Sequence, residues 1–144
     1  MTAGLEPEPR DTVHVSVDAD GAVEARNAAG AGVRIGPPGT PEAFTPVELL
    51  LLALGGCGAI DVVNITTKQR RPVVPFEIEV RGWRAVGEHR VARVRVDYWI
   101  DVGDECEANV RRAIELTAET YCTVSRTLVH ETEVVHELAR RDQD

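Results

Sequence analysis

Apolar and polar residues alternate along several short stretches of the chain, with the two-residue period of a β-strand that buries one face. Val13, Val15 and Val17 form the first of these stretches. The same pattern predicts further strands at residues 76–80 and 94–100. Shorter strands are also expected at residues 23–26 and 33–35, and a closing strand at residues 133–138. Residues 18–21 and 86–89 each contain a glycine, and they predict turns between neighbouring strands.

A long apolar segment predicts a helix from Thr45 to about Gln69. Thr45 can cap its first turn, Pro46 suits the first helical position, and Glu48 completes a capping box. Apolar residues cover every side of this helix between residues 49 and 63. A helix of this kind is buried all round, either in a core or at a subunit interface.

The last third of the chain predicts two more helices. The first begins at Asp104, which can cap it, with Glu107 three residues later. Its inner stripe consists of Val110, Ala113, Ile114 and Thr117. A break is expected near Tyr121, followed by a short helix from Cys122 to about Val129.

This order of elements predicts the α+β class, with antiparallel strands packed on a long buried central helix. A chain of 144 residues fits one hydrophobic core. We therefore expect a flexible N-terminal tail at residues 1–11 and a single domain over residues 12–144.

Composition narrows the range of partners. The net charge is −8, which argues against a nucleic-acid partner because phosphate contacts need clustered Lys and Arg. It also argues against an anionic membrane surface. Residues 1–10 contain no apolar signal-peptide core, and the longest apolar run, residues 49–60, is too short to span a bilayer. The expectation is a cytoplasmic protein with neither nucleic-acid nor membrane partners.

Cys57 lies in the middle of the long predicted helix, within the sequence Gly-Gly-Cys-Gly of residues 55–58. Each glycine costs about 1 kcal/mol relative to alanine inside a helix. Three together indicate that something packs close to the backbone, and they could leave a pocket around the sulfur. The alternative is a small apolar residue at a tight helix contact, because free cysteine is often buried.

Cys122 stands at the start of the short predicted helix. Free backbone amides and the helix dipole would favour its thiolate there, although a core cysteine is the alternative. Cys106 lies between Glu105 and Glu107, whose carboxylates disfavour a thiolate, and we interpret it as incidental. Three cysteines without a Cys-x-x-Cys pair argue against a disulfide scaffold.

Two motifs around these cysteines resemble those of the OsmC/Ohr family, named for osmotically inducible protein C and the organic hydroperoxide resistance protein. Residues 45–63, from TPVELL to GGCGAIDVV, resemble the central-helix motif of that family. Residues 118–125, AETYCTVS, resemble its second-cysteine motif. The separation of the two cysteines also matches, and the resemblance covers about residues 12–138.

The resemblance implies an OsmC-like fold built as an intertwined homodimer, with active sites at the interface. It also implies a thiol peroxidase with Cys57 and Cys122 as catalytic residues. Cys57 would attack an organic hydroperoxide and become a sulfenic acid, and Cys122 would condense with it to a disulfide. An external dithiol, such as a lipoyl protein, would reduce that disulfide, so no bound cofactor or metal is expected.

The resemblance has one departure. In characterised hydroperoxide reductases, a glutamate directly follows the proline of the first motif and holds a catalytic arginine, whereas this chain has Val47. Glu48 comes one place later, roughly opposite Cys57 on a straight helix, and is better explained as a helix cap. Arg34 is the nearest candidate for the arginine, with a solvated strand charge as the alternative.

Asp61 lies one turn after Cys57, on nearly the same face, within an apolar run. A carboxylate there needs a partner or a raised pKa. It could anchor an arginine or cap backbone amides. The four histidines show no ligand spacing, and the sequence selects no third ligand for a zinc site with Cys57 and Cys122.

Two functions follow from these observations. The cysteine pair favours an organic hydroperoxide reductase. Val47, in the place of the family glutamate, favours a non-catalytic protein of the same fold that binds a small hydrophobic or thiol ligand at the dimer interface.

Overall fold

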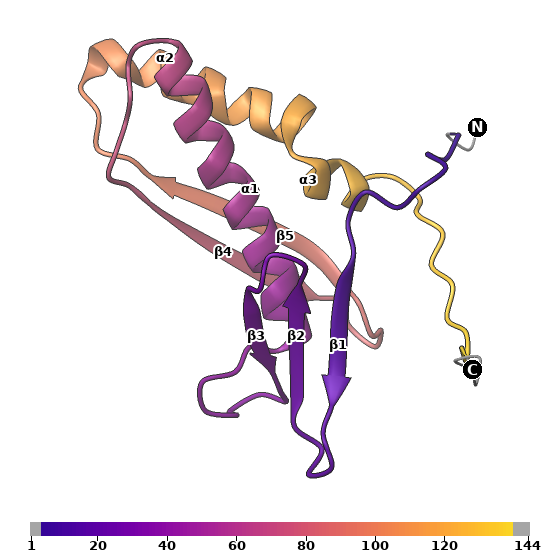
Figure 1. The fold of residues 1–144 in the computed structure, drawn as a ribbon. Helices are drawn as coiled ribbons and strands as arrows, with labels where there is room; N and C mark the ends of the chain where they lie inside the picture. Colours follow the sequence, from indigo (N-terminus) through magenta and orange to yellow (C-terminus); the bar gives the residue numbers. More distant parts are fainter. Residues whose placement is uncertain (1–3, 140–144) are drawn as a thin grey trace. The chain divides into compact units, whose positions relative to one another are not determined.

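The computed structural model describes residues 4–139, and the fold combines strands and helices as predicted (Figure 1). The chain forms two compact units, one ending at Leu50 and the other beginning at Leu51, and each is described by itself. Residues 4–12 have no regular secondary structure, and residues 1–3 of the predicted tail lie outside the described residues. A single domain over residues 12–144 stays a prediction.

The first unit contains an antiparallel sheet of three strands in the order β1-β2-β3. The strands are β1 (Val13–Val17), β2 (Val23–Asn27) and β3 (Gly32–Ile35), and all three were predicted. The turn between β1 and β2 forms because the Asp18 carboxylate accepts two backbone N–H groups, at 2.8 and 3.0 Å, and because Gly21 adopts a φ of 85°.

The sheet has one apolar face. The register places Val13, Val15 and Val17 of β1 across from Asn27, Ala25 and Val23 of β2, so these side chains share one face. The three valines of β1 are nevertheless exposed. The first strand thus forms as predicted, but the face that the alternation predicted to be buried is uncovered in the single chain.

Helix α1 (Pro46–Lys68) begins with the predicted capping box. The Glu48 N–H donates to Thr45 Oγ1 at 3.1 Å, and the Thr45 N–H donates to the Glu48 carboxylate at 3.1 Å. Both bonds satisfy backbone amides that the first helical turn leaves free. Glu48 is therefore a cap, as expected.

Only one stripe of α1 is buried in the chain, at Leu54, Gly58, Val62 and Thr66. Leu52 is 49% exposed and Ile60 is 64% exposed. Burial on every side is therefore wrong for the single chain. With 23 residues and a mean hydropathy of 1.9, α1 is also long and apolar enough to cross a membrane, a property that core helices of soluble proteins share.

The second unit pairs β4 (Glu77–Arg84) with β5 (Val91–Trp99) in an antiparallel hairpin. The inward face of the hairpin lies against α1 at glycines. A Cβ built on Gly55 would lie 2.9 Å from Val80 Cγ2, and one on Gly58 would lie 2.3 Å from the Tyr98 hydroxyl. The close approach inferred from the glycines is confirmed, and the neighbour is the hairpin.

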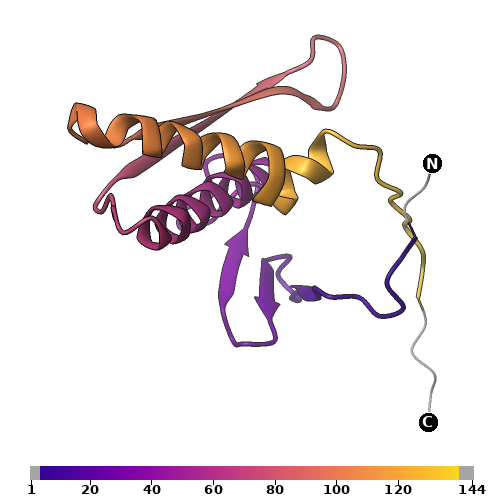
Figure 2. The ribbon, with the colours of Figure 1, turned by 90° about the horizontal axis from the view of Figure 1, so that it is seen from above.

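The small core of this unit lies where α1, the hairpin and α2 (Asp104–Leu116) meet, and Figure 2 shows these elements from above. Its buried residues are Val62, Val73, Val110 and Ala113. The predicted inner stripe of α2 is therefore confirmed, with Thr117 buried beside it. The predicted cap is wrong, because α2 begins at Asp104 itself and Gly103 occupies the cap position without a side-chain bond.

Beyond α2 the chain makes a single π-helical turn, η1 (Thr117–Tyr121), in which the Cys122 N–H donates to the Thr117 carbonyl at 2.8 Å. Cys122 is extended, and α3 (Thr123–Leu128) follows. The break and the short helix are confirmed. The closing strand at residues 133–138 is wrong, because residues 131–139 have no regular structure and the valines that suggested it are exposed.

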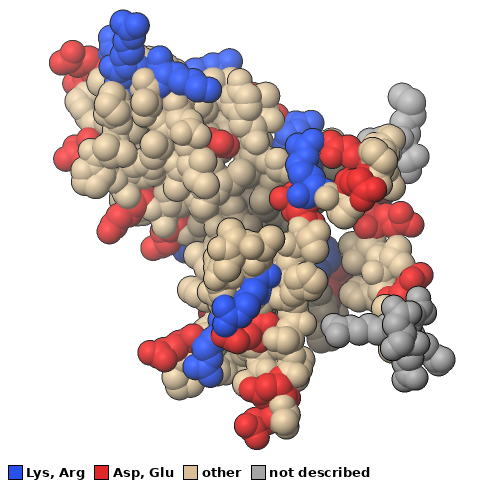
Figure 3. All heavy atoms as spheres, in the orientation of Figure 1, with Lys and Arg blue, Asp and Glu red and all other residues tan. Residues whose placement is uncertain are grey.

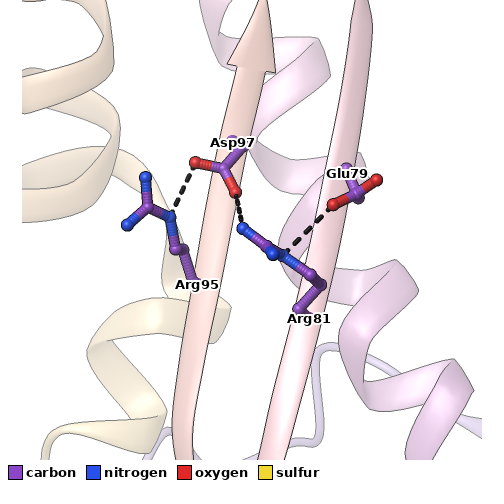
Figure 4. A network of polar contacts seen from close by, with 4 residues as sticks. All are labelled: Glu79, Arg81, Arg95 and Asp97. Atoms are coloured by element: carbon purple, nitrogen blue, oxygen red, sulfur yellow. Dashed lines mark hydrogen bonds and ion pairs between the residues drawn. The ribbon is translucent and has the colours of Figure 1, made fainter.

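The outward face of the hairpin carries a polar network (Figure 4). Asp97 accepts hydrogen bonds from Arg95 and Arg81, each at 2.8 Å, and Arg81 also pairs with Glu79 at 3.1 Å. These bonds, first that from Arg95, lower the pKa of the Asp97 carboxyl. The network joins the two strands on the face away from the core.

Candidate thiol site

Cys57 lies on α1 within the second unit, one residue before the glycine that contacts Tyr98. Its side chain is half-buried. Because Gly58 has no side chain, the hydroxyl of Tyr98 can approach the helix backbone next to the sulfur. The position predicted for the first functional cysteine therefore lies next to the contact between α1 and the hairpin.

Cys122 is the N-cap residue of α3, and its side chain is 1% exposed. Its Sγ accepts a hydrogen bond from the Ser125 N–H at 3.3 Å. Interactions with Val124 and with the Ser125 side chain also lower its pKa. The amides at a helix N-terminus favour a thiolate, as the sequence predicted for this position.

The structure brings the two cysteines together. Burial tends to raise the pKa of Cys122, but interactions with Cys57 and Ser125 outweigh it and lower that pKa. Cys122 in turn raises the pKa of Cys57, so the two thiols lie close enough to influence each other's ionisation. Cys122 is the more acidic of the two.

The pKa of Cys57 is raised to about 11, by burial first and then by its bond to Cys122. A thiol that attacks a peroxide should have a depressed pKa, whereas the pKa of Cys57 is raised in this structure. Burial is the main reason, and Cys122, which accepts the Ser125 amide of α3, is the more acidic neighbour.

Asp61 and Tyr98 complete the cluster. The half-buried Asp61 carboxyl lies one turn after Cys57 on α1, and burial raises its pKa. Its Oδ2 atom is buried without a hydrogen-bond partner. Burial likewise raises the pKa of Tyr98 to about 12, with further contributions from Cys122, Asp61 and Cys57. Four acidic groups thus lie close enough to influence one another's ionisation.

The other residues considered from the sequence lie elsewhere. Cys106 is in the first turn of α2, half-buried. Arg34 is exposed on β3 in the first unit, across from Glu24. Val47 lies in the first turn of α1, beside the cap. Among residues 4–139, no group of three or more His, Cys, Asp or Glu side chains is arranged to hold a metal ion.

Sequence reasoning missed Tyr98 and the donor amides of Val124 and Ser125. Tyr98 alternates with the apolar residues of its strand, so the pattern assigned it to the core. The sequence does contain a signal for the contact of Tyr98 with Gly58. A phenol at an inward strand position and a glycine on the facing helix are complementary in size. The amide donors depend on where α3 begins, which sequence locates only to within a residue or two.

The fold and the two neighbouring cysteines define an α+β protein with a pair of interacting thiols. Comparison with known proteins agrees with this class. The sequence model of the OsmC-like protein family matches residues 39–137. Protein YhfA of Escherichia coli K12 is 35% identical over 96 residues, which span 66% of this chain and 72% of YhfA. The chain belongs to the OsmC-like protein family.

Solved structures share the fold. An OsmC-like protein from Mycoplasma pneumoniae superposes with a TM-score of 0.69 at 15% identity, over 85% of this chain and 89% of that protein. An OsmC-like hydroperoxide resistance protein from Jannaschia sp. CCS1 superposes with a TM-score of 0.54 at 16% identity, over 91% and 92% of the two chains. Some members of the family are thus hydroperoxide resistance proteins.

Proposed function

We propose that this protein is a thiol-dependent peroxidase that reduces organic hydroperoxides. The observation that carries the proposal is the proximity of Cys57 and Cys122, which come from distant parts of the chain and shift each other's pKa. Two neighbouring thiols can form a disulfide with a small shift, and a neighbouring thiol protects a sulfenic acid from further oxidation. The pair has the arrangement that such a cycle requires.

Accessibility assigns the two roles. Cys57 is half-buried, whereas Cys122 is 1% exposed. A peroxide therefore reaches Cys57 more readily, even though Cys122 is the more acidic thiol. Ionisation of the pair with the remaining proton on Cys122 gives the Cys57 thiolate and the Cys122 thiol. Cys57 is the attacking group and Cys122 the resolving group.

The reaction then proceeds in three balanced steps. The Cys57 thiolate attacks the terminal oxygen of ROOH, which with one proton gives a sulfenic acid and ROH. The Cys122 thiol condenses with the sulfenic acid, which releases water and forms the disulfide. An external dithiol, of the kind a lipoyl protein carries, reduces that disulfide by exchange and becomes oxidised itself.

The surroundings of Cys57 favour an alkyl substrate over hydrogen peroxide. Residues three and four positions away on a helix are surface neighbours, and for Cys57 these include Ala53, Leu54 and Ile60. An alkyl group contacts such side chains better than the water-like hydrogen peroxide does. Organic hydroperoxides should therefore react faster.

A homodimer belongs to this proposal. Leu52 and Ile60 are exposed on α1, and Figure 3 shows few charged residues on the face over this helix. The valines of β1 are exposed as well. Uncovered apolar surface of this extent is typical of an interface, and a second copy of the chain would cover it. The cytoplasm, where thiols stay reduced, is the compartment we propose.

The raised pKa of Cys57 favours a second candidate, a non-catalytic protein that binds a small hydrophobic or thiol ligand at the same place. Free-thiol titration before and after one equivalent of cumene hydroperoxide separates the two. A peroxidase loses two thiols promptly in the wild type and in Cys106→Ala, while Cys57→Ser stays inert. Cys122→Ser should stop at a sulfenic acid. A wild type that keeps all three thiols would favour the binding protein.

A further inference from the structure

We propose that Asp61 is a catalytic acid of the thiol site, which protonates the alkoxide that leaves when Cys57 attacks an organic hydroperoxide. The inference rests on the proposed peroxidase function and assigns a further residue to it. It accounts for a buried carboxyl that the cysteine cycle leaves without a role.

Position is the first argument. Asp61 follows Cys57 by one helical turn, so the two side chains are neighbours on the same face of α1. The Asp61 carboxyl also contributes to the ionisation of both Cys57 and Tyr98, which places it within the same cluster. An oxygen that departs from a peroxide bound at Cys57 therefore leaves within reach of this carboxyl.

The second argument is an unmet hydrogen bond. Within residues 4–139, Asp61 Oδ2 is the one buried side-chain oxygen or nitrogen without a hydrogen-bond partner. Buried polar groups are nearly always paired, and an unpaired one destabilises the fold. A carboxyl oxygen left free beside a reactive thiol is available to a substrate oxygen.

The third argument is charge. The groups whose ionisation Asp61 affects are Cys57 on its own helix and Tyr98 on β5, and both are acids. A thiolate that forms at Cys57 disfavours a second negative charge nearby. Burial also raises the pKa of Asp61. Both effects favour the protonated carboxyl, the form that can donate a proton to a leaving alkoxide.

The step balances as follows. The Cys57 thiolate forms a bond to the terminal oxygen, the O–O bond breaks, and its electron pair stays on the alkyl-bearing oxygen. That oxygen takes the Asp61 proton and leaves as an alcohol, and the Asp61 carboxylate regains a proton from water after the alcohol departs. Tyr98 is a weaker acid than a carboxyl, and its raised pKa of about 12 makes it a poorer donor.

The test varies how strongly the leaving group needs a proton. tert-Butyl hydroperoxide releases a strongly basic alkoxide, whereas peracetic acid releases acetate, which leaves without a proton. Stopped-flow oxidation of Cys57 should show that Asp61→Asn lowers the rate with tert-butyl hydroperoxide by roughly 100-fold. The rate with peracetic acid should change by less than about threefold, because no acid is needed in that reaction.

The comparison of two oxidants within one variant also controls for folding and for thiol ionisation. Asp61→Glu should restore part of the lost rate, and Tyr98→Phe should leave the ratio of the two rates unchanged. An equal loss with both oxidants would show that Asp61 acts on the thiol or the fold, and would overturn the inference. A wild type in which Cys57 reacts with neither oxidant would instead overturn the proposed function.

Discussion

Cys57 lies beside Cys122, the residue that caps α3, and each thiol shifts the pKa of the other. The cap and the pair are linked, because a sulfur that accepts a helix amide stabilises its thiolate more readily than its neighbour does. Cys122, the buried thiol, is therefore more acidic than the more accessible Cys57. The reactivity of Cys57 depends on Cys122 even before any oxidation.

Removal of Cys122 should make Cys57 more acidic. Cys122 raises the pKa of Cys57 both by its hydrogen bond and by its charge, so Cys122→Ala should lower that pKa from about 11. Alkylation by iodoacetamide at pH 8 should then speed up by about tenfold for each unit by which the pKa falls. Peptide mass analysis locates the label, and Cys106→Ala provides the control. An unchanged rate at Cys57 would show that the two thiols are not coupled.

Gly58 should tolerate no side chain. A Cβ there would lie 2.3 Å from the Tyr98 hydroxyl, so Gly58→Ala should destabilise the fold by about 1–3 kcal/mol in urea unfolding. Gly56→Ala is the matched control, because a Cβ on Gly56 meets nothing within 4 Å in the chain. Tyr98→Phe removes the hydroxyl and should reduce the loss caused by Gly58→Ala. Equal effects of the two alanines would contradict the contact.

Local patterns were sufficient for much of this fold. The capping box at Thr45 and Glu48 depends on residues three positions apart. The alternation in a strand depends on residues two positions apart. Both are visible in a single sequence. The strand expected at residues 133–138 shows the limit of local patterns. Such a pattern can suggest a strand, but it cannot supply the neighbouring strand with which it must pair.

The candidate site was predictable in part. The position of Cys122 at a helix start followed from the sequence around it. The sequence did not indicate which of the two thiols is the more acidic. That difference depends on burial and on which sulfur receives the amides of α3. The contact of Tyr98 with Gly58 is set by the packing of a hairpin on a helix, which no local pattern contains.

Because of the polar network around Asp97, the stability of the fold should decrease at acid pH. Arg95 and Arg81 lower the pKa of Asp97 below its ordinary 3.8, so the folded state favours the ionised carboxyl. Its contribution is present above pH 3.8 and is lost as the pH falls through the lowered pKa of the folded state. Asp97→Asn should flatten the decline of the unfolding midpoint in this acid range.

The exposed apolar residues of α1, Leu52 and Ile60, should hold two copies of the chain together. Light scattering at micromolar concentration should give about twice the chain mass of 15.7 kDa. Ile60→Lys places a charge on the exposed stripe and should shift the equilibrium to the monomer, because a buried unpaired charge is strongly unfavourable. Val86→Lys, in the fully exposed hairpin turn, is the control. A wild-type chain that stays folded and monomeric at this concentration would remove the dimer from the proposal.

Oxidation should link Cys57 to Cys122 and loosen α3. After mild treatment with cumene hydroperoxide, peptide mapping should find this disulfide and leave Cys106 free. A disulfide sulfur is a weaker acceptor than a thiolate, so the bond from the Ser125 N–H to Cys122 should weaken. Since α3 buries no residue of its own, its amides should then exchange hydrogen faster. Cys57→Ser, which cannot form the link, should show no change in exchange on treatment. A dominant link through Cys106 would mean that the functional pair has been assigned wrongly.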